Sequence, residues 1–116
     1  MSEKIETVFD DVCKVLLQLK MRPAMFVPPD NGVITYFAVS TYLMGAFLAL
    51  SICTGREIHN EISCWFGEKI GTESRSVGFM RQVKSYYKKN TDAELIDILI
   101  DLIVEFLKQC GGNEHE

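Results

Sequence analysis

Residues 31–55 contain no charged side chain, although 24% of the residues in this 116-residue chain are charged. A run of this length must be kept from water, either in a protein core or in a bilayer, which about 20 apolar residues suffice to span. We expect a protein core, because the run includes polar Thr35, Ser40 and Ser51 and lacks aromatic and basic anchors at its ends. Amphipathic segments on both sides also need an apolar partner, which this run supplies.

Apolar residues recur at helical spacing along most of the chain, and no stretch alternates cleanly as a strand does. The expected helices are 2–20, 33–54, 57–70, 76–89 and 91–109. The sequence therefore predicts an all-α fold, a single-domain bundle of about five helices around the central apolar helix 33–54. The domain is expected to cover residues 1–112 and to be followed by a disordered tail, 113–116.

Residues with strong positional preferences mark the expected helix ends. Pro23 ends the first helix, because the residue before a proline avoids helical geometry. Asp30 or Asn31 is expected to cap the second helix. Thr91 and Glu94 match the capping box, in which each side chain accepts a hydrogen bond from a backbone N–H of the other residue.

The composition argues against several classes of protein. A net charge of −4 disfavours a general nucleic-acid binder. The four cysteines are widely spaced and no histidine lies at metal-ligand spacing, so we expect reduced, mostly buried thiols and no metal or cofactor. Neither His59 nor His115 belongs to a recognisable catalytic motif, so we expect no catalytic residue and no enzyme activity. The N-terminal residues lack the features of a signal peptide, which favours a cytoplasmic protein.

Acidic side chains recur four residues apart on the last helix. Asp97, Asp101 and Glu105 share one face and Glu94 extends the row, and we call these four residues the acidic ridge. Such a row attracts a basic partner through steering and complementary potential. It is equally the pattern of a solvated face on an amphipathic helix, and the sequence leaves both interpretations open.

The segment before the last helix is basic, with five basic residues and no acid between Arg75 and Asn90. Its stretch from Arg81 to Lys89 includes Tyr86 and Tyr87, a combination able to contact a nucleic-acid backbone and stack a base. The alternatives are a solvated lysine face above two core tyrosines, or pairing of these lysines with the acidic ridge within the fold.

The segment Arg22-Pro23-Ala24-Met25-Phe26 joins the first helix to the uncharged run. It resembles a turn in the ATPase subunit of type II topoisomerases, but the helix that follows it here has no Glu, Asp or Asn to serve that family's catalysis. The layout of residues 10–50 is similar to that of small bacterial immunity proteins of polymorphic-toxin and contact-dependent growth inhibition systems. In physical terms, Pro23 would stop a helix, Met25 and Phe26 would fill the core, and Arg22 would cap the preceding carbonyls.

This resemblance implies an immunity protein that binds and neutralises a cognate protein toxin by occluding its active surface. On this hypothesis the toxin surface is basic, and the acidic ridge is the first candidate contact. The alternative is a homo-oligomeric helical interaction or regulatory module, in which Gly45 and Ala46 let helices approach closely. A small nucleic-acid-binding protein that uses Arg81 to Lys89 ranks third. We expect no membrane partner, and a homodimer is compatible with the first two interpretations.

Overall fold

The computed structural model describes residues 2–71 and 78–112, and the side chains of residues 7–71 and 78–110. The described residues form five α-helices and no strand, so the prediction of a compact, single-domain all-α fold is confirmed. The predicted tail 113–116 lies outside the described residues. The helices are α1 (Ser2–Met21), α2 (Tyr36–Thr54), α3 (Ile58–Ile70), α4 (Phe79–Tyr86) and α5 (Asp92–Gly112), with a 3₁₀ turn, η1 (Pro23–Met25).

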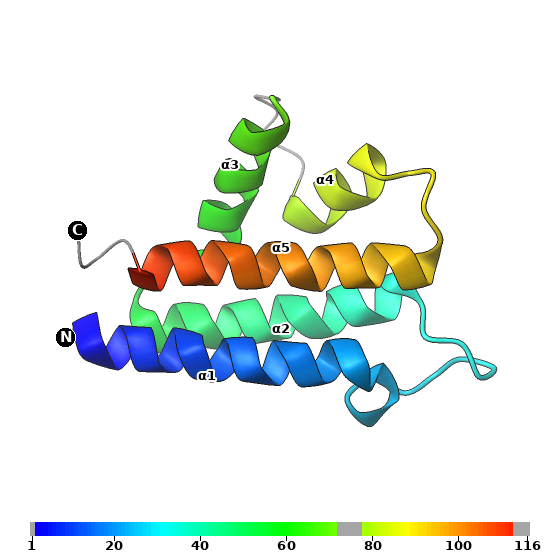
Figure 1. The fold of residues 1–116 in the computed structure, drawn as a ribbon, viewed down its shortest axis with the longest axis horizontal. Coiled ribbons are helices and arrows are strands. Elements are labelled where there is room, and N and C mark those ends of the chain that lie inside the picture. The colour runs from blue at the N-terminus through cyan, green and yellow to red at the C-terminus, as the bar shows by residue number, and fades with distance from the viewer. Residues whose placement is uncertain (1, 72–77, 113–116) are drawn as a thin grey trace.

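The helices form a flat slab. Three long helices, α1, α2 and α5, run along the long axis, and the shorter α3 and α4 lie together against one side of them (Figure 1). The molecule measures 44 × 33 × 21 Å along its principal axes. Because one helix with its side chains is about 10 Å across, the shortest dimension leaves room for only about two layers of helices. A slab this thin leaves part of every long helix facing solvent.

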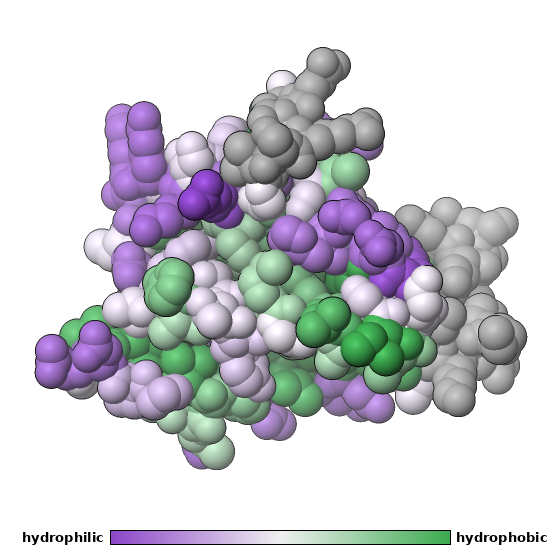
Figure 2. Space-filling view, turned by 180° about the vertical axis from the view of Figure 1, so that it is seen from behind, coloured by the Kyte–Doolittle hydropathy of each residue, from purple (hydrophilic) through white to green (hydrophobic). Residues whose placement is uncertain are grey.

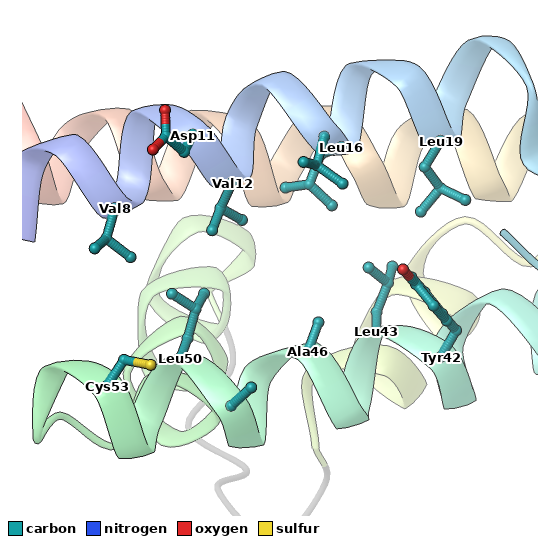
Figure 3. Close-up of a pocket in the computed structure, with 12 residues that line it drawn as sticks. Val8, Asp11, Val12, Leu16, Leu19, Tyr42, Leu43, Ala46, Leu50 and Cys53 are labelled. Atoms are coloured by element: carbon teal, nitrogen blue, oxygen red, sulfur yellow. The ribbon is translucent and has the colours of Figure 1, made fainter.

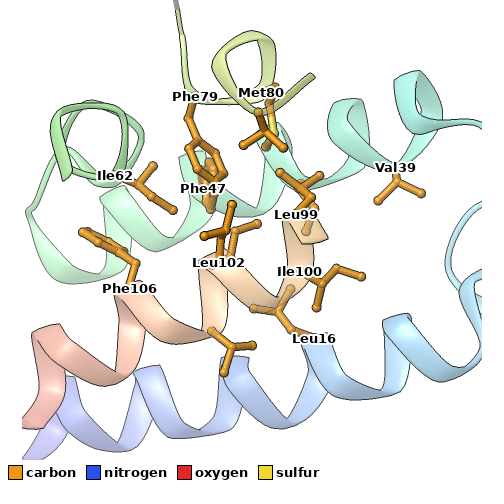
Figure 4. Close-up of a cluster of buried hydrophobic side chains, with 14 of the residues drawn as sticks. Leu16, Val39, Phe47, Ile62, Phe79, Met80, Leu99, Ile100, Leu102 and Phe106 are labelled. Atoms are coloured by element: carbon orange, nitrogen blue, oxygen red, sulfur yellow. The ribbon is translucent and has the colours of Figure 1, made fainter. Parts of the chain in front are cut away.

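The central helix is α5, which contacts α1, α2, α3 and α4. Figure 4 shows Leu99, Ile100 and Leu102 of α5 pointing into the space between the other helices. Leu99 and Ile100 have no exposed surface at all. The buried residues of α5 are Leu95, Ile96, Leu99, Ile100, Leu102, Ile103, Val104, Phe106 and Leu107.

The predicted bundle of about five helices is confirmed, and α5 is more deeply buried in it than the apolar helix 33–54. Helix α2 lies behind α1 and α5 in the view of Figure 1, on one broad side of the slab, and buries only part of its circumference. A helix that is apolar all round carries no polar face to mark which side meets water, so its position cannot be read from its pattern. The acidic ridge is confined to one face of α5, and the rest of that helix is free to contact four neighbours.

The start of α2 is set by a tight turn that precedes it. The backbones of Asp30 and Val33 exchange two hydrogen bonds of 2.8 and 3.0 Å, and both central residues, Asn31 and Gly32, have positive φ angles of 53° and 79°. Asn-Gly is the dipeptide that adopts this left-handed geometry most readily. The turn occupies Asp30 and Asn31, so the prediction that one of them caps the helix is wrong.

Thr35 caps α2 instead, with its Oγ1 accepting a hydrogen bond of 3.1 Å from the Ala38 N–H. The Asp92 carboxylate accepts a second bond of 3.0 Å from the Tyr36 N–H. The Tyr36 hydroxyl, buried in the core, donates a bond of 2.6 Å to the carbonyl of Met80. The first turn of α2 is thereby fixed to both α4 and α5.

The capping box at the start of α5 is confirmed. The Thr91 Oγ1 accepts from the Glu94 N–H at 3.2 Å, and the Glu94 carboxylate accepts from the Thr91 N–H at 2.8 Å. That backbone hydrogen bond lowers the pKa of Glu94, because it favours the charged carboxylate. One member of the acidic ridge is thus occupied by a structural role.

Helix α4 is shorter than predicted, spanning Phe79–Tyr86 instead of 76–89, and residues 76 and 77 lie outside the described part of the chain. Its first N–H, that of Phe79, donates to Ser63 Oγ at 3.1 Å, which joins it to α3. Tyr86 was expected to point inward but is 56% exposed. Tyr86 is the last residue of α4, so its ring lies at the end of the helix.

The turn after α1 is only partly core-forming. The Arg22 backbone N–H, not its side chain, satisfies the Gln18 carbonyl at 2.8 Å. Phe26 is half-buried and its ring meets that of Tyr42 edge-on at 6.2 Å, whereas Met25 is 71% exposed. Successive residues of a 3₁₀ turn point about 120° apart. The prediction that both Met25 and Phe26 fill the core is therefore wrong for Met25.

His59 provides a pH-dependent contribution to stability. Its ring is half-buried beside Phe47, with ring centroids 6.1 Å apart, and it lies so close to Gly78 that a Cβ there would come within 3.1 Å of the imidazole. Burial lowers the pKa of His59 below 6.5, because it disfavours the imidazolium. The unfolded chain takes up this proton near pH 6.5 and the folded chain only at lower pH. The stabilisation present above pH 6.5 is therefore lost as the pH falls through the lowered pKa.

We expect the free energy of unfolding of the natural chain to fall more steeply between pH 7.5 and pH 5.0 than that of the His59→Gln variant. Urea titrations at several pH values measure both slopes, and the comparison removes the contribution of the carboxylates that the two chains share. Parallel slopes would show that the protonation of His59 is not linked to folding.

Candidate interaction surfaces

The outer side of α2 is an uncharged surface exposed to solvent. Phe37 and Ile52 are each 76% exposed and Leu48 is 63% exposed. Viewed from behind, the molecule shows apolar residues gathered in a band across its lower half (Figure 2). We call the exposed positions on this side the α2 face: Phe37, Thr41, Met44, Gly45, Leu48 and Ile52.

A contiguous apolar surface of this kind is unusual for a protein that functions alone in water, and commonly marks a binding surface. By length and composition alone, α2 is also able to cross a membrane, and only 28% of its most apolar window is buried. The expectation that this run is kept from water in a protein core is met only on one side of the helix, because Phe37, Leu48 and Ile52 are exposed. The α2 face is therefore a candidate binding surface.

Beside this face, α1 and α2 are separated by an apolar groove of about 330 Å³. Figure 3 shows the side chains of the two helices pointing toward one another across it, with Asp11 the one charged residue in its lining. Ala46 and Ala49 on α2 are too small to fill the space between the helices. The lining consists of Val8, Asp11, Val12, Val15, Leu16, Leu19, Tyr42, Leu43, Ala46, Ala49, Leu50 and Cys53.

The structure brings the acidic ridge together along the solvent side of α5, but lysines from other helices pair with part of it. Lys20 of α1 lies 2.8 Å from Asp101, and Lys69 of α3 lies 2.9 Å from Glu105. The hydrogen bond to Asp101 raises the pKa of Lys20, and the charge of Asp97 acts in the same direction. Solvent screens exposed pairs of this kind, so they leave the carboxylates available to a partner.

Asp97 is the ridge member with the fewest internal ties. Its side chain is exposed, and within the described part of the chain it accepts no hydrogen bond. Asp101 keeps 58% of its side chain exposed despite its bond to Lys20. These two neighbouring carboxylates are the part of the ridge best placed to bind another molecule.

The basic stretch from Arg81 to Lys89 does not pair with the acidic ridge, whose two ion pairs in the described residues go to Lys20 and Lys69. Lys84 lies over the ring of Tyr36, with its Nζ 6.0 Å from the ring centroid. Tyr86 and the half-buried Tyr87 meet edge-on, with ring centroids 4.9 Å apart. This edge-to-face contact covers part of both rings.

The described residues contain no group of three or more His, Cys, Asp or Glu side chains arranged to hold a metal ion. Cys13 is buried, which raises the pKa of its thiol, whereas Cys53 and Cys64 are exposed, so the expectation of mostly buried thiols is wrong. Arg56 Nη2 lies 3.6 Å from Cys110 Sγ. His115 lies outside the described residues.

We find no matching family model, no matching curated protein and no matching solved structure for this chain. Sequence reasoning located the acidic ridge but not the α2 face, which it assigned to the core. The sequence does not distinguish the exposed side of α2 from its buried side, because both sides are uncharged.

Proposed function

We propose that this protein is a cytoplasmic immunity protein that binds a cognate bacterial toxin and neutralises it by occluding the toxin's active surface. The observation that carries the proposal is the row of exposed carboxylates on α5, the helix that contacts every other helix. A toxin that acts on RNA or DNA needs a positively charged cleft, and an acidic surface on a protein competes for it.

The setting of the acidic ridge favours tight binding. Its helix is anchored by nine buried side chains, so the backbone under the carboxylates does not need to become ordered when a partner binds. The contacts from Lys20 and Lys69 hold Asp101 and Glu105 in position before binding. Less conformational entropy is then lost at the interface. The resemblance of residues 10–50 to small immunity proteins points to the same kind of partner.

Charge reversal tests this proposal. We expect Asp97→Lys to weaken binding to the cognate toxin domain by about tenfold or more and to flatten the salt dependence of the affinity. Asp97 is the best position, because its replacement breaks no ion pair within the described residues. Calorimetric titration at two salt concentrations measures both effects, and co-expression measures the loss of protection.

The matched control is Asp10→Lys on the exposed side of α1, which changes the net charge by the same amount. Its affinity should stay within about twofold of the natural chain, since screening weakens the effect of a charge outside the interface. If both variants weaken binding equally, overall net charge and not the acidic ridge determines the affinity. If neither variant changes the affinity, the acidic ridge is a solvated face.

A further inference from the structure

We propose that the α2 face is an interface between two copies of this chain, packed with their α2 helices antiparallel about a two-fold axis that passes between Met44 and Gly45. The face is uncharged and exposed, and it is centred on the middle of α2, which spans Tyr36–Thr54. This inference is independent of the toxin proposal, which uses α5.

The spacing of the exposed positions is symmetric, as an interface between identical surfaces requires. Phe37 and Ile52 are equally far from the midpoint of Met44 and Gly45, and so are Thr41 and Leu48. In an antiparallel pair, Phe37 of one copy meets Ile52 of the other, and Thr41 meets Leu48. Gly45 lies at the crossing point, where the absence of a side chain lets the two backbones approach.

Charge favours a second copy as the occupant. The chain has a net charge of −4, so most pairings of identical surfaces bring like charges together. Residues 31–55 contain no charge, which makes this surface one that two copies bring together without electrostatic repulsion. The antiparallel orientation also places the positive end of each helix dipole beside the negative end of the other.

The α2 face is long enough to serve as an interface. From Phe37 to Ile52 it extends about 22 Å along the helix. The apolar groove beside the α2 face, with Tyr42 and Ala49 in its lining, extends the area available to the second copy.

The first test compares the molar mass of the natural chain with that of Gly45→Glu by light scattering over a dilution series. A Cβ at Gly45 meets no atom within 4 Å, so the substitution leaves the packing of a single copy intact. We expect the natural chain to have twice the mass of 13.2 kDa and the variant to have this mass once. The control, Ser85→Glu on the exposed side of α4, should remain dimeric.

The second test determines orientation by disulfide cross-linking in a Cys53→Ser/Cys64→Ser background. Phe37→Cys combined with Ile52→Cys should give a covalent dimer on oxidation, whereas each single variant should not. The two positions are about 22 Å apart along one helix, too far for a bond within one copy.

Each other outcome contradicts the proposal. A monomeric natural chain, or a dimer that persists in Gly45→Glu, would show that a second copy does not cover the α2 face. Cross-linking of the single variants would show a parallel pair. A monomer that binds phosphatidylcholine vesicles and loses this binding in Gly45→Glu would identify a lipid surface as the cover.

Discussion

Replacing Leu99 by alanine should lower the free energy of unfolding by about 2–5 kcal/mol, whereas Leu48→Ala should change it by less than about 0.5 kcal/mol. The two substitutions remove the same atoms from different helices. Leu99 of α5 has no exposed surface, so its loss leaves a cavity among the other helices. Leu48 of α2 is 63% exposed, so its loss removes few contacts.

Both leucine variants are best made in the Gly45→Glu background, so that self-association through α2 does not enter the comparison. Urea unfolding followed by circular dichroism gives the two free energies. A larger loss of unfolding free energy for Leu48→Ala than for Leu99→Ala would show that α2, not α5, is the most deeply buried helix. The proposals for both surfaces would then be wrong.

Replacing Phe79 by alanine should have an effect of similar size, about 3–5 kcal/mol. Its fully buried ring meets those of Phe47 and Phe66, with centroids 6.4 and 5.6 Å away. Phe79 therefore connects α4 to both α2 and α3. Phe37→Ala is the matched control, because Phe37 is 76% exposed and its loss opens no cavity within one copy.

The Phe79→Ala variant should also show where stability is lost. Hydrogen exchange is expected to become faster throughout α3 and α4 before it does so in α1 and α5, because α3 and α4 pack together on one side of the slab (Figure 1). Uniform acceleration in every helix would mean that the two short helices do not open as a unit.

The sequence predicts the helices well and their arrangement poorly. Pro23, Gly55 and the capping box at Thr91 each act within a few residues, so they mark helix ends correctly. The start of α2 was placed three residues early because the Asn31-Gly32 turn closes a bridge between Asp30 and Val33 that competes with a helix cap. Helical periodicity alone contains no information on this competition.

The exchange of roles between α2 and α5 has a physical cause. Absence of charge is not a measure of burial, because it shows only that no position requires water. The acidic ridge occupies one face of α5, and the rest of the helix buries nine apolar side chains. Which helix is buried most deeply depends on how the helices pack against one another. This packing involves contacts between segments far apart in sequence.

The acidic ridge was predicted from its spacing, and its carboxylates do share one side of α5. Its internal partners could not be predicted, because Lys20 is 81 residues from Asp101 and Lys69 is 36 residues from Glu105. The α2 face was missed for the reason that misplaced its helix. Core-facing surfaces and interfaces are both made of apolar residues, so only the fold distinguishes them.

The most direct test of the whole account is the reactivity of thiols placed on two sides of α2. Leu48→Cys and Leu43→Cys are introduced separately into the Cys53→Ser/Cys64→Ser background, with Gly45→Glu to keep the chain monomeric. Leu48 is 63% exposed and Leu43 is 1% exposed. We expect a small thiol reagent to modify the first at least about a hundredfold faster than the second, because a buried thiol reacts only when the helix opens. Equal protection of the two thiols would show that α2 is enclosed on all sides, which contradicts the exposed α2 face.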